Sequence, residues 1–446
     1  MREDEIGPIT EMRSGDDDPE EGPSPTVGPT RPRLFKVLGP GLITGASDDD
    51  PSGIATYSQA GAAFGYRLSW AMLFSYPLMV AVQMISARIG RTTGHGIAGV
   101  LRLHYPQWVL SWVVLLLLIA NIINLGADLG AMADATALLL PVPRALYVLL
   151  FAAICISLQL FLQYSRYVAV LKWLTAALLA YFGVVMVVHV DWPALLANLF
   201  WPHLSANGGY LTTLVAILGT TISPYLFFWQ ASEEAEDIQV HPRRIDLFDA
   251  PAQGKRALRR IELDTFIGMG FSNLVALAII VTTAATLNPH GITNIQTSAQ
   301  AAAALRPLAG KFAEAVFAVG IIGTGLLAVP VLAGSAAYAI GEARQWPTGL
   351  ARRPKEAQAF YATLVIATLV GMIINFAPID PIKALFWSAV VNGVVAVPVL
   401  VVMMKLVARA DIMGPFVVRG ALKFFGWAAT ALMAMVVAAM LALMVW

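Results

Sequence analysis

Residues 39–54 read Gly-Pro-Gly-Leu-Ile-Thr-Gly-Ala-Ser-Asp-Asp-Asp-Pro-Ser-Gly-Ile, and they combine apolar residues with three consecutive carboxylates. It lies in an apolar run long enough to cross a bilayer, yet Asp48–Asp50 place three carboxylates near the middle of that run. Pro51 removes a backbone donor and clashes with the preceding turn, and Gly53 weakens the helix further. Unpaired backbone at membrane depth is tolerated only where it is buried in protein or lines a cavity. The stretch therefore predicts a spanning helix that is interrupted at a functional site.

The composition of the whole chain is that of a polytopic helical membrane protein. Of its 446 residues, 58% are hydrophobic and only 13% are charged, whereas a soluble chain carries about 25% charged residues. Long apolar runs without alternation are not barrel strands. The single cysteine, Cys155, excludes a disulfide framework, and a net charge of +1 gives no indication of a nucleic-acid partner.

We predict an acidic, disordered cytoplasmic tail over 1–33, followed by eleven spans. The first five-helix unit occupies 34–188, an extracellular loop 189–210, a second unit 211–407, and the eleventh helix 408–446. The segment 91–105 is expected to be an amphipathic lead-in to the third span. The predicted spans are 37–66, 69–90, 107–140, 143–163, 167–188, 211–236, 262–286, 312–342, 358–376, 383–407 and 420–446.

The sixth span carries a second interruption. Gly219 and Pro224 flank a polar stretch that contains Thr220 and Ser223. Each interrupted helix opens a unit of five spans, and an odd number of spans gives the two units opposite orientations. Broken helices at matching positions of two inverted halves indicate a transporter site near the bilayer midplane.

The basic residues set the predicted orientation. With the N-terminus in the cytoplasm, all but five of the 29 Lys and Arg residues lie on the cytoplasmic side. The exceptions are Arg67, Arg144, Arg306, Lys311 and Lys383. The bias and the short connections fit the inner membrane of a prokaryotic cell.

Asp50 is the leading candidate for the site. A charge inside a spanning helix costs roughly 2.5–3.5 kcal/mol on insertion scales and is functional by default. The sequence is compatible with two roles for Asp48 and Asp49. They line the entry path of the ion, or they cap the second half-helix by accepting backbone N–H bonds.

These residues carry a resemblance to a known family. Gly39-Pro-Gly41, Asp50-Pro51 and Ile54-Ala55-Thr56 resemble the first helix of the NRAMP divalent metal-ion transporters, and 89–94 with Tyr105-Pro106 resembles the entry to their third span. The resemblance implies an all-α, LeuT-type fold with two inverted five-helix repeats. It also implies an ion held between the first and sixth helices.

Departures from the family pattern are similar to those of the NRAMP-related magnesium transporters. The family's Asn ligand in the first helix is replaced by Gly53, and its Met-Pro-His by Ser223-Pro224-Tyr225, with Thr220 at the Ala position. Carboxylate, hydroxyl, carbonyl and water suit Mg²⁺ and Mn²⁺, whereas a thioether selects softer metals. The metal ligands that we expect are Ser47, Asp49, Asp50, Gly53, Thr220, Ser223 and Asn392, with Asp48, Asp128 and Tyr225 in a vestibule or relay.

Family members typically carry protons with the metal, and this chain lacks parts of that relay. Asp128 keeps the family's Asp, but the Glu three residues later is replaced by Ala131, and the ninth span contains no Arg. All six histidines fall in predicted connections. We therefore expect weak or absent proton coupling. Asp128 is a relay acid, an outer-vestibule acid or a structural carboxylate bonded to a neighbouring helix.

The sequence thus predicts a monomeric secondary transporter in the bilayer that imports partly hydrated Mg²⁺ and also Mn²⁺, without a cofactor. A proton-coupled Mn²⁺/Fe²⁺ transporter is the alternative. An intramembrane aspartyl enzyme and a channel are weaker alternatives. Two smaller expectations concern acidic residues. The first is that Glu233, Glu234, Glu236 and Asp237 form an ordinary polar exit at the inner end of the sixth helix, or else a cation-attracting vestibule. The second is that Asp134 is solvated.

Overall fold

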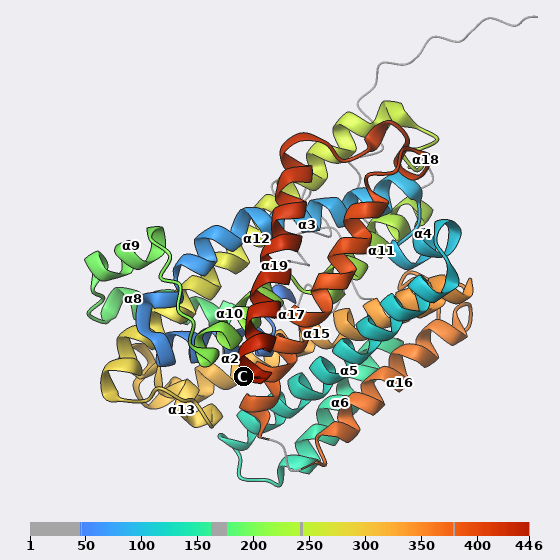
Figure 1. Cartoon of the computed structure of the whole chain (residues 1–446). Helices are drawn as coiled ribbons and strands as arrows, with labels where there is room; N and C mark the ends of the chain where they lie inside the picture. The colour runs from blue at the N-terminus through green and yellow to red at the C-terminus, as the bar shows by residue number, and fades with distance from the viewer. Residues whose placement is uncertain (1–44, 46, 162–175, 241–243, 378–379, 446) are drawn as a thin grey trace, which may run out of the picture.

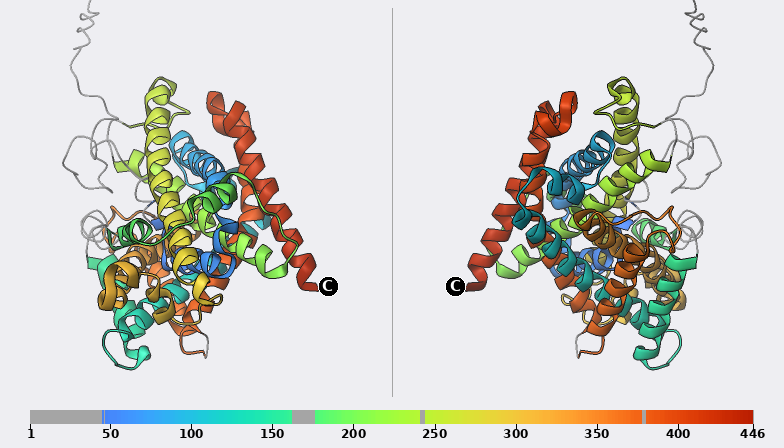
Figure 2. Two further views of the ribbon diagram at one scale, coloured as in Figure 1. Left: turned by 90° about the vertical axis from the view of Figure 1, so that its left-hand side faces the viewer. Right: turned by 90° about the vertical axis from the view of Figure 1, so that its right-hand side faces the viewer.

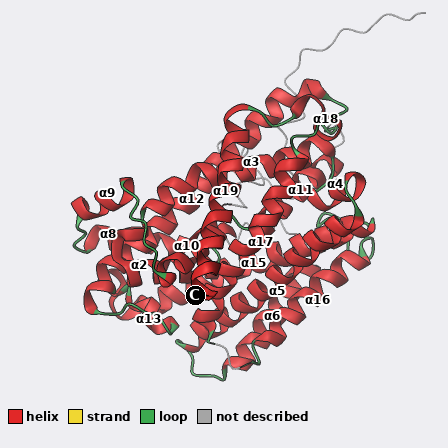
Figure 3. Cartoon of the chain, in the orientation of Figure 1, coloured by secondary structure: helices red, strands yellow, loops and turns green. Residues whose placement is uncertain are grey.

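A computed structural model describes residues 45, 47–161, 176–240, 244–377 and 380–445. Within this described part the chain is helical, with helices joined by turns and short loops and no strand (Figure 3). The predicted tail, the Gly39–Gly41 motif and the first part of the fifth span lie outside the described residues.

The spanning helices match the sequence prediction closely. Eight helical segments of the described residues are long and apolar enough to cross a membrane, and two more are shorter apolar helices. With α2, whose predicted span begins outside the described residues, they account for all eleven predicted spans. Their bounds are α2 (Pro51–Phe64), α3 (Trp70–Thr93), α5 (Gln107–Ala137), α6 (Arg144–Phe161), α8 (Leu179–Val187), α10 (Gly208–Thr221) with α11 (Pro224–Val240), α12 (Gly254–Thr286), α15 (Ala313–Arg344), α16 (Gln358–Ile374), α17 (Pro381–Leu406) and α19 (Gly420–Val445).

Shorter helices connect these spans. The α-helical ones are α4 (Ile97–His104), α9 (Trp192–Phe200), α13 (Ser298–Ala303), α14 (Arg306–Ala309) and α18 (Ala410–Met413). Single 3-10 turns are η2 (Gly65–Leu68), η3 (Ala176–Leu178), η4 (Pro251–Gln253), η5 (Asn288–His290), η6 (Gly310–Phe312) and η7 (Gly414–Phe416).

The two interrupted helices lie at the centre of the bundle. The apolar part of α10 and α11 is 89% buried, whereas that of α6 and of α19 is only 33% buried. Helix α2 packs on α12, α17 and α10, while α11 packs on α3 and α15. Helix α19 runs along one side of the molecule, at its edge (Figure 2). The arrangement encloses the two breaks in protein, as unpaired backbone at membrane depth requires.

Close contacts between backbones hold this centre together. Gly219 of α10 faces the Ala389 carbonyl and Gly393 of α17, and a methyl group at Gly219 would overlap both. Gly334 of α15 makes room in the same way for the Trp229 ring of α11. Small residues therefore set the spacing of the helices around the sixth span.

Two predicted connections differ in detail from the structure. The lead-in 91–105 is two pieces: α3 ends at Gly94, whose φ of 66° favours glycine, and α4 follows as a separate helix. Arg91 is buried there and donates to the Ile245 carbonyl at 2.6 Å. The connection 189–210 contains α9, which Asp191 caps by accepting from Ala194 N.

The end of the molecule that carries α4, α18 and the C-terminal ends of α11 and α15 is called inner here, and the end with α8, α9 and α13 is called outer (Figure 1). This naming follows the orientation that the basic residues predict.

Candidate metal-ion site

The predicted break in the first helix lies at Asp49 and Asp50. Helical residues precede a bend at Asp49, and Asp50 is extended, with φ −67° and ψ 169°. Asp50 then caps α2: its Oδ1 accepts from Gly53 N at 2.8 Å and from Ser52 Oγ at 2.6 Å. Pro51 occupies the first helical position, where no backbone donor is needed. The residues that interrupt the first half-helix therefore also start the second.

The break in the sixth helix is equally local. Helix α10 ends at Thr221, Ile222 leaves the helical region with φ −122° and ψ 61°, and α11 begins at Pro224. The Ser223 hydroxyl lies 2.7 Å from the Gly219 carbonyl and 2.6 Å from the Thr220 carbonyl. These carbonyls belong to the last turn of α10, which has no further helical donors. Ser223 thus caps the first half-helix from the interruption itself.

Asp50 joins three helices through one buried carboxylate. Its Oδ2 accepts from Asn124 Nδ2 of α5 at 3.1 Å and from the Tyr225 hydroxyl of α11 at 3.3 Å. The side chain of Asp50 is only 2% exposed. The acid predicted as the centre of the site therefore lies between the two broken helices and faces α5 as well.

Protein donors engage both oxygens of the Asp50 carboxylate, two at each oxygen. A carboxylate offers about four lone-pair positions, so a cation reaches it by replacing a donor or through a water molecule. The Tyr225 bond is the longest of the four, and the same hydroxyl lies 3.1 Å from the Ser47 carbonyl. Because a tyrosine has one hydroxyl proton, Tyr225 can turn to Ser47 and free one position on Asp50.

The other two acids of the triplet face a different helix. Asp48 Oδ2 and Asp49 Oδ1 lie 2.6 Å and 3.2 Å from the Ser272 hydroxyl of α12. Over the described residues, no three His, Cys, Asp or Glu side chains are grouped so as to hold a metal ion. The three neighbouring carboxylates therefore do not form one acidic cage. Asp50 bonds to α5 and α11, whereas Asp48 and Asp49 bond to α12.

Gly53 is closely packed beside the carboxylate, and it brings no side chain of its own to this position. A Cβ atom there would lie 3.6 Å from Asp50 Oδ1 and 3.2 Å from the Tyr57 ring. The Tyr57 hydroxyl lies 2.9 Å from Thr220 Oγ1, so it ties α2 to α10 next to Gly53. The position of the family's Asn ligand is thus next to Asp50, and here it carries no side chain.

Three further predicted residues are buried with polar atoms that have no hydrogen-bond partner among the described residues: Ser47 Oγ, both oxygens of Asp128 and the whole amide of Asn392. Asp128 is close enough to Asp50 for the two charges to interact. The absence of a partner argues against Asp128 as a structural carboxylate bonded to a neighbouring helix. No described hydrogen bond connects Asn392 to Asp50.

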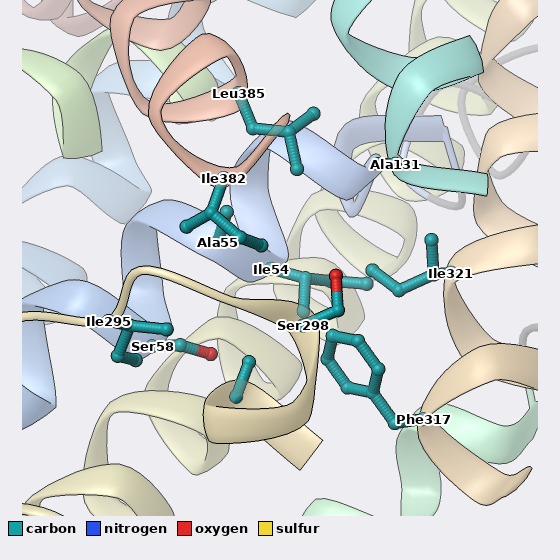
Figure 4. Close-up of a pocket in the computed structure, with 11 residues that line it drawn as sticks. Ile54, Ala55, Ser58, Ala131, Ile295, Ser298, Phe317, Ile321, Ile382 and Leu385 are labelled. Atoms are coloured by element: carbon teal, nitrogen blue, oxygen red, sulfur yellow. The ribbon is translucent and has the colours of Figure 1, made fainter. Parts of the chain in front are cut away.

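A vestibule of about 510 Å³ lies at the outer end, where residues of α2, α10 and α17 line it. Below it lies a cavity of about 10 Å³, scarcely room for one water molecule. Ile295 and Ile382 line both spaces, and in the smaller one they meet Ile54, one turn after Asp50 (Figure 4). These three isoleucines, named the apolar seal below, line the small cavity, and Asp50 lines neither space.

Ser298, which also lines the small cavity, donates to the Asp134 carboxylate of α5. The prediction that Asp134 is solvated is therefore incomplete, because this half-buried acid fixes the start of α13 against α5.

The inner end of α11 is not an ordinary polar exit, and that prediction is wrong. Glu233, Glu234, Glu236 and Asp237 are each at most 5% exposed. Glu234 binds Arg260 at 2.6 Å, and Asp237 binds Arg244. Since cations of other segments cover these acids, they close the inner end instead of lining an open vestibule.

Glu236 adds a second layer to this closure. Its carboxylate accepts from the Tyr338 hydroxyl and from the backbone N–H groups of Leu350 and Ala351, the latter at 3.1 and 2.6 Å. Glu342 lies one turn after Tyr338 on α15 and accepts a hydrogen bond from Gly99 N at 2.9 Å. Carboxylates thus tie α11 and α15 to the loop and the short helix at the inner end.

Sequence reasoning missed Asn124 and Ser272, which contact the acids of the first helix from α5 and α12. A signal for Asn124 was present: Asn121, Asn124 and Asp128 recur at helical spacing, so they share one face of an otherwise apolar span.

Comparisons with known proteins place the chain among metal transporters. A sequence model described as "Natural resistance-associated macrophage protein-like" matches residues 41–443. The "Divalent metal cation transporter MntH" of Deinococcus radiodurans is 28% identical over 90% of this chain and 88% of its own length. The protein of the same name from Burkholderia ambifaria is 26% identical over 89% and 86%.

Solved structures share the fold at low identity. The Eremococcus coleocola manganese transporter superposes with a TM-score of 0.73 at 17% identity, covering 93% of this chain and 89% of the other. The nucleobase-cation-symport-1 family transporter Mhp1 gives a TM-score of 0.52 at 14% identity, covering 95% of both chains.

Proposed function

The chain belongs to the natural resistance-associated macrophage protein-like (Nramp) family, and from this premise we propose that it imports divalent metal cations across a cell membrane by alternating access. The cargo is partly hydrated Mg²⁺, with Mn²⁺ as a second substrate. The ion binds at Asp50, and proton coupling is weak or absent.

The observation that carries this proposal is the set of groups around Asp50. The hydroxyls of Ser52 and Tyr225, the amide of Asn124 and the backbone of Gly53 contact its carboxylate. None of these groups is a thioether or thiolate that would favour a softer metal, and Gly53 and Ser223 stand where the family has an amide and a thioether. Mg²⁺ is usually held by one or two carboxylates and keeps several waters, and at Gly53 no side chain competes with those waters for Asp50.

The two closures support alternating access. Asp50 lines neither the outer vestibule nor the small cavity beside the apolar seal, and buried carboxylates close the inner end. Both broken helices come from one chain, so a monomer suffices. The membrane potential alone can drive uptake, because two charges crossing 100 mV release roughly 4.6 kcal/mol.

A proton-coupled Mn²⁺ transporter is the second candidate, and Asp128 is the observation that favours it. A buried acid beside Asp50 is suited to carry a proton. Against it, no arginine lies on α16, and Ala131 replaces the second acid of the family's relay.

Uptake by purified protein in liposomes tests the proposal. Mg²⁺, Mn²⁺ and Ca²⁺ are offered at a fixed membrane potential, with a pH-sensitive dye inside the vesicles. We expect saturable Mg²⁺ and Mn²⁺ uptake without acidification. Acidification in proportion to Mn²⁺ uptake, without Mg²⁺ uptake, would establish the second candidate instead.

A further inference from the structure

Asn124 of α5 has one satisfied and one unsatisfied half. Its Nδ2 donates to Asp50 Oδ2 at 3.1 Å, while its Oδ1 is buried without a hydrogen-bond partner among the described residues. The residue is 0% exposed. A buried acceptor left without a donor costs about 1–3 kcal/mol, so this position calls for a donor that the described side chains do not supply.

The orientation of the Asn124 amide follows from chemistry. Turning the amide over would place its oxygen against a carboxylate oxygen, two acceptors facing each other. With Nδ2 on Asp50, Oδ1 is held beside the same carboxylate by the planar group. The two unpartnered oxygens of Asp128 lie one helical turn further along the same face of α5.

Water molecules bound to a divalent cation are donors that need acceptors of this kind. Mg²⁺ gives up its waters reluctantly, so a site for it needs acceptors around the waters as well as a carboxylate. No side chain at Gly53 can fill that role from α2, whereas Asn124 reaches Asp50 from α5.

We propose that Asn124 is a specificity-determining residue, which holds Asp50 in place through Nδ2 and accepts through Oδ1 a hydrogen bond from a water of the bound cation. This role rests on the proposed transport of a partly hydrated ion. It makes Mg²⁺ more dependent on Asn124 than Mn²⁺ is, because Mg²⁺ keeps its waters more firmly.

The test is uptake of Mg²⁺ and Mn²⁺ at subsaturating concentrations into liposomes that contain the full-length protein or an Asn124 variant. Asn124→Leu keeps the approximate size and removes the acceptor. Loss of a group in the outer shell of a metal site typically lowers affinity about 10–100-fold. We expect Mg²⁺ uptake to fall by this factor and Mn²⁺ uptake to fall less, so that the Mg²⁺:Mn²⁺ ratio drops.

Two further variants separate the acceptor from a structural role. Asn124→Gln keeps both the amide donor and the acceptor on a side chain one methylene longer, so it should restore part of the Mg²⁺:Mn²⁺ ratio that Asn124→Leu loses. Asn121→Leu is the matched control: Asn121 lies on the same helix but donates to the Leu332 carbonyl and Ser335 of α15. It should lower thermal stability and leave the ratio unchanged.

The outcomes are distinguishable. Without Mg²⁺ uptake by the unaltered protein, the proposed cargo fails, and the role of Asn124 fails with it. If the unaltered protein carries Mg²⁺ while Asn124→Leu keeps its ratio, or loses both ions equally as Asn121→Leu does, only the role of Asn124 is overturned. A ratio in Asn124→Gln as low as in Asn124→Leu would likewise overturn the acceptor role.

Discussion

Replacing Asp50 by Asn removes one charge and changes little else at the break in the first helix. Asn is as good a helix N-cap as Asp, so Gly53 N keeps its acceptor and α2 keeps its start. The new amide faces the donor of Asn124, which costs about 1–3 kcal/mol unless that amide turns over. We therefore expect a folded protein with a modestly lower unfolding temperature.

The effect on the cation is much larger. Two unit charges 4 Å apart interact by about 4 kcal/mol at an effective dielectric constant of 20, which gives about 8 kcal/mol for a divalent ion and Asp50. If lost hydration offsets half of this, about 4 kcal/mol remains, or roughly a thousandfold in Kd.

Calorimetric titration with Mg²⁺ and Mn²⁺, together with uptake into liposomes, measures this loss. Asp49→Asn is the matched control, because it removes the same charge one residue away but from a side chain that binds Ser272 on α12. Its affinity should fall far less. Equal losses in the two variants, or an unchanged affinity in Asp50→Asn, would refute the assignment of Asp50 as the ligand.

Three other variants test the surroundings of the site. Gly53→Asn with Ser223→Met restores the family's amide and thioether and should shift selectivity from Mg²⁺ towards Mn²⁺ and Cd²⁺ in competition uptake. Unchanged selectivity would show that Gly53 and Ser223 do not determine which metal is bound. Ile295→Ala opens the apolar seal. In a variant that lacks Cys155, a cysteine introduced at Ser52 should then react faster with a thiol reagent added outside. Equal reaction rates with and without Ile295→Ala would count against the seal. Glu236→Ala removes hydrogen bonds to a charged group that are worth about 1.5–3 kcal/mol each, so hydrogen exchange at 346–357 should rise by roughly tenfold or more; unaltered exchange would show that this contact does not hold the inner end closed.

Both interruptions were predictable because their causes are local. Pro51 and Pro224 each lack a backbone donor, and Asp50 and Ser223 cap the half-helices from inside the breaks, so a short stretch of sequence contains the reason for each. The position of Asp50 between the broken helices followed from the same local signals together with the inverted order of the two halves.

Contacts between distant segments could not be predicted in this way. Asp48 and Asp49 turn to Ser272 on α12, which no local pattern indicates. The acids at the end of α11 looked like a solvated exit because Arg244, Arg260 and Tyr338, which bury them, follow later in the chain. Charge patterns give the composition of a segment, whereas burial depends on what packs against it.

The position of a bound ion would show whether Asp50 is its ligand. Crystals of the protein grown with Mn²⁺ and measured at the manganese absorption edge would locate the ion by its anomalous signal. We expect one strong peak between α2 and α11, against the Asp50 carboxylate and bordered by Tyr225 and Asn124. A peak held by Asp48, Asp49 and Ser272, or none near the breaks, would contradict it.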